Sequence, residues 1–315
     1  MQRIIPLELV GNDKLDFDLY DENGEVIYQS GDKFTPDFLM MLNYKKVYRR
    51  SEPVSLDFEN NQPEKSQGIN ECKSVISDTA TDFLIKSTKK VLRAIYDNEQ
   101  PDIDICEAAR NTIVEEVGSK IEQIECISQL RIFDEYTFSH TVNVSSMSTA
   151  LGIILGFNEE DIKDLALGAL LHDIGKMEIP KNILNKPGKL DPDEFNFMRN
   201  HSILGYQYIK NKMGFSDKIS QVALEHQERY GGGGYPNGLK GKEISLFAQV
   251  TAIADVYDAL VSNRVYKRAI ASSSALKLML SEGSSSFNPY MLYKFIYLAN
   301  YKDTVNLVVD DKDKV

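Results

Sequence analysis

The stretch LLHDIGKMEIP, residues 170 to 180, places an imidazole beside a carboxylate, with a lysine three residues further on. His172 and Asp173 can reach one metal cluster from adjacent positions on a helix. Residues three and four apart share a helix face, so Lys176 would lie close to both of them. Its ammonium group could then be directed at whatever the pair holds.

Further candidate ligands are spread along the chain between residues 140 and 255. The sequence has four histidines, each in a helix-like segment, and an aspartate follows in the apolar run VTAIADVYDAL. The candidate ligands are His140, His172, Asp173, His201, His226 and Asp255. One histidine alone is more often a structural residue, but five successive helices that each offer a ligand favour a metal site. Imidazole with carboxylate suits iron, manganese or zinc better than calcium or magnesium.

The two oxygens of Asp173 could bridge two ions. A two-metal site lowers the pKa of a bridging water, and the resulting hydroxide can attack phosphorus in line with a leaving alkoxide. That chemistry is hydrolysis of a phosphodiester or a phosphate. Lys176 would add positive charge beside the equatorial oxygens of the transition state. A solvated lysine at a helix end is the other interpretation of Lys176.

A glycine-rich stretch, HQERYGGGGYPNGLKG, begins at the candidate ligand His226. Four consecutive glycines allow the backbone to approach a ligand closely, although an ordinary surface loop has the same composition. Arg229, Tyr230 and Tyr235 could pair with phosphate or stack on a base. We therefore expect this loop to form part of a substrate pocket.

The elements that must position these residues are mostly helical. Strand patterns with a hairpin predict a small β-rich module over residues 1–50, and residues 51–70 have the composition of a linker. A connecting helix is expected over 71–105, a helical domain over 106–301 and a charged tail over 302–315. One buried helix is expected from Asn158 to Met177, ended by Pro180. The fold class is therefore mainly α, with a small β-rich N-terminal domain.

Composition restricts the possible partners. A formal charge of −11 argues against a nucleic-acid polymer, whose binding requires many Lys and Arg side chains. The apolar stretches fall short of the roughly 20 residues that span a bilayer, and no secretory signal is recognisable. The cysteines Cys72, Cys106 and Cys126 form no C-x-x-C pair, which indicates reduced thiols. We expect a soluble cytoplasmic protein.

Several motifs together resemble the HD-GYP family over about residues 106–299. They are H-D-I-G-K at 172–176, K-P-G-K-L at 186–190, E-R before the glycines, G-Y-P at 234–236 and A-D-V-Y-D-A-L at 254–260. The resemblance implies a helical, metal-dependent phosphodiesterase that hydrolyses cyclic di-GMP to pGpG, and in some members on to GMP. It also implies iron or manganese as cofactor and a role in bacterial signalling.

The resemblance also implies roles for individual residues. The first ion would be held by His140, His172, Asp173 and Asp255, and the second by Asp173, His201 and His226. Asp173 and Lys176 would act in catalysis. Substrate contacts would come from Lys176, Arg229, Gly234, Tyr235 and Pro236.

Four positions depart from the family pattern. Gln227 replaces a second histidine, and because an amide oxygen is a poorer ligand than imidazole, the second ion is expected to be held loosely, replaced or absent. Gly231 stands where an aspartate is usual, and Val265 interrupts an Arg-Pro-Tyr-Arg motif. Tyr136 replaces the glutamate of members with a third ion, which predicts no third ion.

Two alternatives follow from these departures. A catalytically degenerate domain would act as a nucleotide-binding or protein-interaction signalling module, with a homodimer or a signalling protein as partner. An active enzyme could instead take a different cyclic dinucleotide or a nucleotide ester. The signal sensed by the N-terminal module is not encoded in any recognisable motif.

Overall fold

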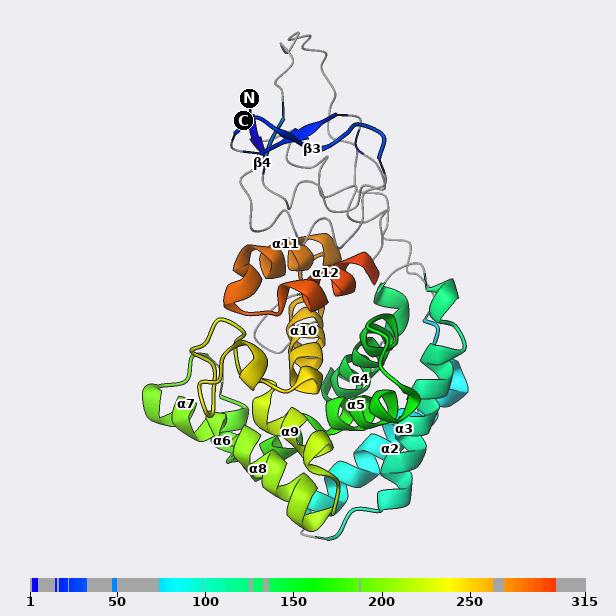
Figure 1. The fold of residues 1–315 in the computed structure, drawn as a ribbon. Helices are drawn as coiled ribbons and strands as arrows, with labels where there is room; N and C mark the ends of the chain where they lie inside the picture. The colour runs from blue at the N-terminus through cyan, green and yellow to red at the C-terminus, as the bar shows by residue number, and fades with distance from the viewer. Residues whose placement is uncertain are drawn as a thin grey trace, which may run out of the picture.

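A computed structural model describes residues 2–4, 15, 17–21, 23–32, 47–49, 74–97, 99–124, 127–132, 136–186, 188–262 and 269–298. This part of the chain is mainly helical, with a small antiparallel sheet near the N-terminus (Figure 1). The predicted fold class is confirmed. The boundaries drawn at 50/51, 70/71 and 301/302 lie outside the described residues, as do Cys72 and Cys126.

The small sheet has the strand order β1-β4-β2-β3. Its strands are β1 (Gln2–Ile4), β2 (Leu19–Tyr20), β3 (Val26–Tyr28) and β4 (Val47–Arg49). The predicted hairpin is present, because β2 and β3 pair antiparallel with Leu19 opposite Tyr28. In the turn, the Asp21 carboxylate accepts the backbone N–H groups of Asn23 and Glu25, both at 2.9 Å. This side-chain turn fixes the register of the hairpin.

The helical part follows in chain order. Its α-helices are α2 (Asp78–Tyr96), α3 (Ile103–Gly118), α4 (Tyr136–Ile154), α5 (Glu159–Leu171), α6 (Lys181–Leu184), α7 (Pro192–Arg199), α8 (His201–Gln207), α9 (Asp217–Glu225), α10 (Leu246–Val261), α11 (Ser272–Glu282) and α12 (Pro289–Leu298). Shorter helical turns are η2 (Ile121–Gln123), η3 (Ile127–Leu130), η4 (Ile174–Glu178), η5 (Tyr208–Lys212), η6 (Gly241–Glu243) and η7 (Gly283–Ser285). The boundary expected at 105/106 falls inside α3.

Side-chain caps explain where three of the later helices begin. Asp191 forms a capping box with Glu194 before α7. The hydroxyl of Ser216 accepts the N–H of Ile219 at the start of α9, and Ser245 caps α10 in the same way. Each cap satisfies a backbone donor that the first turn of a helix leaves unpaired.

Helix α4 lies at the centre of the bundle and packs against α5, α10 and α3 (Figure 1). Its buried residues include serines, which allow the helices to approach closely; Ser145 Oγ donates to the Ala166 carbonyl of α5 at 2.7 Å. A helix buried on all sides brings its polar side chains into the interior. No helix within the described ranges is both long enough and apolar enough to cross a membrane.

The helix expected from Asn158 to Met177 is wrong, because the structure divides this stretch. Helix α5 ends at Leu171, and the 3₁₀ turn η4 begins at Ile174. A Cβ atom on Gly175 would lie 2.0 Å from the His201 carbonyl oxygen, so α8 packs directly on the backbone of η4. Glycine is also a poor helix former. The break places His172 and Asp173 between two elements.

Replacing Gly175 tests this close approach. We expect Gly175→Ala to lower the free energy of unfolding by about 1–3 kcal/mol, because the added methyl group would displace backbone atoms of α8. Gly118→Ala in α3 is the matched control: nothing lies within 4 Å of the place its added methyl group would take, and it should be neutral or slightly stabilising. Urea unfolding measures both, and equal midpoints for the two variants would contradict the expectation.

Candidate metal centre

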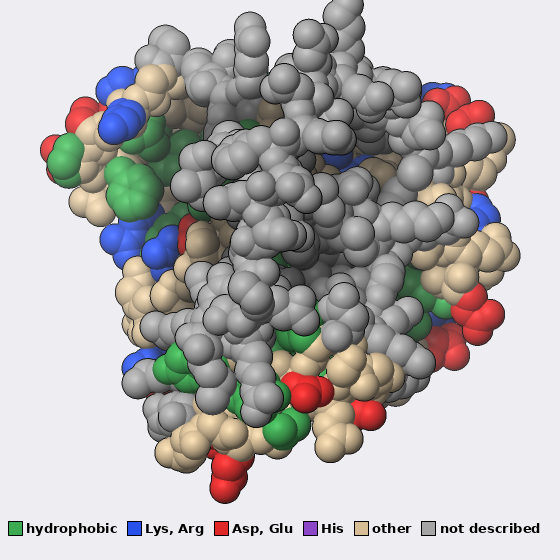
Figure 2. Space-filling view, turned by 90° about the horizontal axis from the view of Figure 1, so that it is seen from above, with side chains coloured by type: hydrophobic (Ala, Val, Ile, Leu, Met, Phe, Trp, Pro, Cys, Tyr) green, Lys and Arg blue, Asp and Glu red, His purple; other side chains and the backbone are tan. Residues whose placement is uncertain are grey.

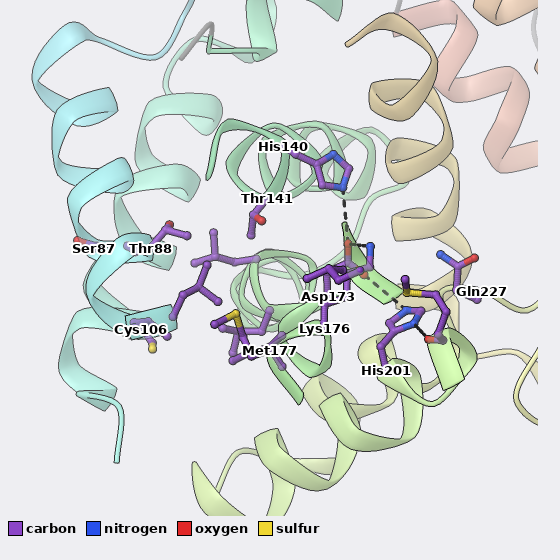
Figure 3. A pocket seen from close by; sticks show the side chains of 18 of the residues that line it. Ser87, Thr88, Cys106, His140, Thr141, Asp173, Lys176, Met177, His201 and Gln227 are labelled. Carbon is purple, nitrogen blue, oxygen red and sulfur yellow. Dashed lines mark hydrogen bonds and ion pairs between the residues drawn. The ribbon is translucent and has the colours of Figure 1, made fainter. Parts of the chain in front are cut away.

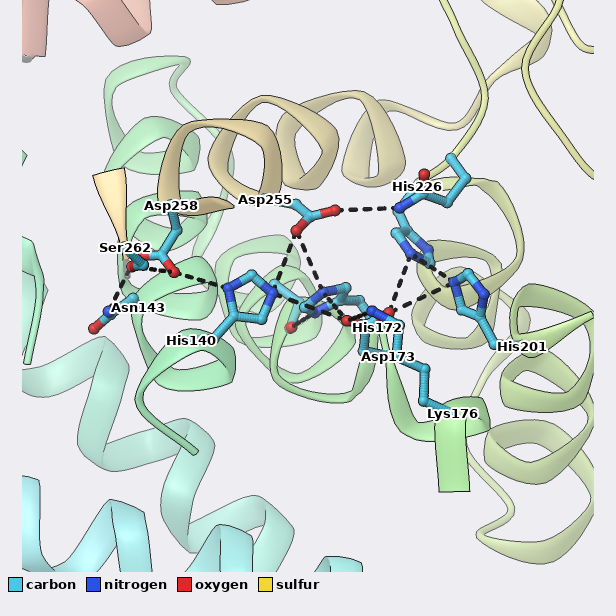
Figure 4. A network of polar contacts seen from close by, with 12 residues as sticks. His140, Asn143, His172, Asp173, Lys176, His201, His226, Asp255, Asp258 and Ser262 are labelled. Carbon is cyan, nitrogen blue, oxygen red and sulfur yellow. Dashed lines mark hydrogen bonds and ion pairs between the residues drawn. The ribbon is translucent and has the colours of Figure 1, made fainter. Parts of the chain in front are cut away.

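The six predicted ligands come together between the helices (Figure 4). His140 lies in α4, His201 is the first residue of α8 and Asp255 lies in α10. The sequence placed all four histidines within helices. His172 and His226 instead lie directly after the last residues of α5 and α9. All four histidines are at most 6% exposed. Accordingly, no histidine is visible among the described residues on the face in Figure 2.

Asp173 lies at the middle of the four imidazoles. One carboxylate oxygen, Oδ2, is 3.3 Å from His172 Nε2 and 3.9 Å from His140 Nε2. The other oxygen, Oδ1, is 3.5 Å from His201 Nε2 and 3.6 Å from His226 Nε2. Each oxygen of this carboxylate therefore faces a different pair of histidines.

The second ring nitrogen determines what three of these histidines can do. The Nδ1 atoms of His172, His201 and His226 donate to the backbone carbonyls of residues 169, 198 and 223, at 2.8, 2.7 and 2.9 Å. A carbonyl can only accept, so Nδ1 carries the proton and the lone pair of a neutral ring is on Nε2. All three Nε2 atoms then face Asp173 as acceptors.

This concentration of acceptors fits a cation. The Nε2 atoms of His201 and His226 are 3.3 Å apart, and two lone pairs at that distance need a proton or a cation between them. Buried His172 Nε2 and Asp173 Oδ1 have no hydrogen-bond partner among the described residues. Within the described part of the chain, two groups have ligand atoms close enough for one ion: His140, His172 and Asp255, and His172, Asp173 and His226. The residues thus suit divalent metal ions.

His140 is held by a residue that the sequence did not single out. Its Nε2 is 3.3 Å from Asp255 Oδ1, and its Nδ1 lies 2.8 Å from Asp258 Oδ2. Asp258 is fully buried and accepts from Arg131 Nε at 2.9 Å and Asn143 Nδ2 at 3.1 Å. An aspartate one turn after Asp255 was the available signal. Its carboxylate orients the ring of His140.

Burial and neighbouring charges set the protonation of the centre. Burial lowers the pKa of His201 to about 4, and the positive charge of Lys176 acts in the same direction. For Asp173, burial raises the pKa, but Lys176 and His172 outweigh burial and hold it well below its usual range. Burial also lowers the pKa of His140, yet hydrogen bonds to Asp255 and Asp258 raise it to about 9. A metal bound at His140 would therefore release a proton.

Gln227 faces the first group of ligands. Its amide Nε2 donates to Asp255 Oδ2 at 3.3 Å. This hydrogen bond occupies one oxygen of Asp255 and leaves the other, Oδ1, directed toward His140. Gln227 thus acts on Asp255 in this structure, whereas the sequence suggested an effect at His201 and His226.

A cavity of about 510 Å³ lies beside the centre (Figure 3). Lys176 lines it, and its ammonium pairs with the Asp173 carboxylate, as the spacing of three residues predicts. Tyr235 of the glycine-rich loop also lines it, with its ring edge-on to His201 at 6.1 Å between centroids. The guanidinium of Arg199 lies 4.9 Å from the Tyr235 ring centre. Arg199 had no signal in the sequence.

Other residues of the glycine-rich loop fix the conformation of its own backbone. Buried Glu228 accepts the N–H groups of Asn237 and Gly238 at 2.7 and 3.0 Å. A Cβ atom on Gly234 would lie 2.4 Å from the backbone nitrogen of Arg229. These contacts fold the loop back on itself and hold Tyr235 at the cavity.

Four residues of this loop that were expected at the substrate do not line the cavity: Arg229, Tyr230, Gly234 and Pro236. The Arg229 side chain is 56% exposed and lies 3.8 Å from Glu282 of α11. At Gly231, an added Cβ would lie 2.8 Å from the Ser285 carbonyl oxygen, which leaves no room for the usual aspartate. The side chain of Tyr136 and all of Val265 lie outside the described residues.

Comparison with known proteins adds independent findings. Residues 126–290 match the model of the HD domain family. A cyclic di-GMP phosphodiesterase of Pseudomonas aeruginosa is 36% identical over 193 residues, which are 60% of this chain and 46% of that protein. The cyclic di-GMP phosphodiesterase response regulator RpfG of Xanthomonas campestris is 39% identical over 170 residues, which are 52% of this chain and 45% of that protein.

The matched regions thus span less than half the length of these two relatives. Among solved structures, an HD-G"Y"P protein from Bdellovibrio bacteriovorus superposes with a TM-score of 0.56 and 20% identity. The alignment covers 93% of this chain and 97% of that chain. The arrangement of elements is therefore shared well beyond the metal centre.

Proposed function

This chain belongs to the HD domain family of metal-dependent phosphohydrolases, and from that premise we propose that it hydrolyses cyclic di-GMP as a phosphodiesterase. One observation carries the proposal: the Nε2 atoms of all four histidines lie within 3.9 Å of a single carboxylate, that of Asp173. Relatives named for this activity are 36% and 39% identical to the chain over 193 and 170 residues.

The proposed cofactor is a pair of divalent ions, iron or manganese, which imidazole and carboxylate ligands suit. The first would be held by His140, His172, Asp173 and Asp255, and the second by Asp173, His201 and His226. The two oxygens of the Asp173 carboxylate face different pairs of histidines, which supports this division of the ligands. When bound, such ions supply Lewis acidity and lower the pKa of a water enough for attack on phosphorus at neutral pH.

Three side chains of this protein would bind the phosphate, exclude water and orient a metal ligand. The Lys176 ammonium, at the edge of the cavity, would pair with a non-bridging phosphate oxygen, where a fixed positive charge stabilises the transition state. The Tyr235 ring would limit the space beside His201 and help to exclude water. Asp258 would keep the His140 ring in its ligating orientation.

The direct test uses purified full-length protein loaded with Fe²⁺ or Mn²⁺ without oxygen. We expect cyclic di-GMP to be converted to pGpG, with or without further cleavage to GMP, as followed by chromatography. Absence of turnover by protein that holds two ions, tested once with Fe²⁺ and once with Mn²⁺, would refute the proposal. Binding of cyclic di-GMP without hydrolysis would instead favour the nucleotide-binding signalling module.

Substitution of Gln227 tests the weak point of the ligand set. We expect Gln227→His to lower the dissociation constant of the more weakly bound ion by about tenfold, because neutral imidazole is a better ligand than an amide for these metals. Gln221→His, in the same helix α9 but outside the cavity lining, is the control. Metal titration and elemental analysis measure the effect. A loss of metal in Gln227→His would indicate instead that the hydrogen bond to Asp255 is required.

A further inference from the structure

The cavity beside the metal centre has two unlike ends (Figure 3). One end carries His140, Asp173, His201 and Gln227. The other end, which we call the apolar arm, extends between α2, α3 and η4. Its wall includes Val91, Leu92, Ile105, Cys106, Ala109 and Met177. The chemistry proposed at the metal centre makes no use of this arm.

The lining of the apolar arm restricts its occupant. Burial of a phosphate or another charged group away from compensating charge is costly, and the charged side chains that line the described cavity, Asp173 and Lys176, are at the metal end. Burial raises the pKa of the Cys106 thiol to about 12, so this side chain is also neutral at pH 7. The arm therefore suits an uncharged, largely apolar group.

Continuity of the cavity indicates which group this is. A ligand whose phosphodiester lies beside Asp173 and Lys176 can extend into the arm without leaving the cavity. In a cyclic dinucleotide, the purine base is the only part that is flat, uncharged and rich in apolar surface. We propose that the apolar arm binds one purine base of the substrate, an inference that rests on the function proposed above.

One polar group in the arm is available to the base. Thr88 of α2 lines the cavity, is only 7% exposed, and its hydroxyl has no hydrogen-bond partner among the described residues. Threonine populates two χ1 rotamers in helices, so rotation can exchange its methyl and hydroxyl groups. A ring nitrogen or exocyclic group of the base would satisfy a hydroxyl that is otherwise buried without a partner.

The same lining determines how selective the arm is. Guanine presents two adjacent N–H donors, which a carboxylate matches best, and Asp173, the only carboxylate that lines the described cavity, is at the metal end. Without such a partner, guanine gains little over adenine in the arm. We expect replacement of one guanine of the substrate by adenine to change kcat/KM by less than about tenfold.

Filling the arm tests the proposal. Ala109→Leu places a larger side chain in the cavity wall of α3, and we expect the KM for cyclic di-GMP to rise about tenfold or more. The kcat at saturating cyclic di-GMP should change less than about twofold, because the substitution leaves the metal end of the cavity unchanged. Ala108→Leu is the matched control, because the neighbouring Ala108 is exposed and does not line the cavity. Thr88→Val should raise the same KM about threefold or more.

The outcomes separate this inference from the proposed function. An unchanged KM in Ala109→Leu would overturn the base site, even if the protein is an active phosphodiesterase. If the wild-type protein does not hydrolyse cyclic di-GMP, calorimetric titration of the wild-type protein and both variants with adenosine and guanosine tests the base site directly. Nucleoside binding that Ala109→Leu weakens and Ala108→Leu does not would support the site, and absence of binding would overturn it. Thermal unfolding confirms that each variant is folded.

Discussion

Asp173→Asn is expected to lower kcat/KM for cyclic di-GMP by about a thousandfold or more and to remove most of the bound metal. Both carboxylate oxygens face histidine Nε2 atoms. An amide keeps the size of the side chain but has one acceptor oxygen and no charge. The substituted side chain could therefore serve one pair of histidines at most.

Turnover and elemental analysis of the same preparation measure this effect. Asp82→Asn in α2 is the control, because the Asp82 side chain is 76% exposed and pairs only loosely with Lys86, at 3.9 Å. The control should keep both metal and activity. Full metal content in Asp173→Asn would refute a bridging role for Asp173, and full activity would refute the proposed reaction.

The clustering of the candidate ligands was predictable from the sequence because histidine is scarce in this chain. With four histidines in the whole chain, their recurrence in successive helices was informative, and the structure brings all four around Asp173. Three helix starts have a local cause, since Asp191, Ser216 and Ser245 cap the helices that follow them. Such signals depend on residues within one turn of each other.

What the sequence did not reveal depends on contacts between distant residues. Helix α5 ends before Asp173 where α8 packs against Gly175. Two of the donors to Asp258 are far away in sequence, since Arg131 and Asn143 precede it by 127 and 115 residues. Residue type alone cannot identify which distant donors will meet a buried carboxylate. The helical periodicity of Asn158 to Met177 was real, but it extended past the point where tertiary packing ends the helix.

The glycine-rich loop illustrates the same limit. Arg229 is three residues from His226, and that closeness in sequence predicted a contact with substrate. The structure turns its guanidinium toward Glu282, while Tyr235 reaches the cavity from further along the loop. Hydrogen bonds from the loop backbone to Glu228 determine which side chains face inward.

Lys176→Met should lower kcat for cyclic di-GMP by about 10²- to 10³-fold, the effect of losing one charge that acts on the transition state. Its metal content should not fall. The Lys176 ammonium contacts Asp173 and repels a cation bound there, so its removal should leave metal affinity unchanged or increase it. The exposed Lys189, outside the cavity lining, provides the control Lys189→Met.

A joint loss of metal and activity in Lys176→Met would mean that Lys176 organises the ligands, and its proposed contact with phosphate would be refuted. Lys176→Arg helps to separate charge from geometry, since guanidinium retains the charge but presents it in a planar fork. Partial recovery of kcat in this variant is expected, because a positive charge is restored near the phosphate while its position differs. Equal kcat in Lys176→Met and Lys176→Arg would instead show that charge at this position does not contribute to the rate, because the two side chains share only their aliphatic part.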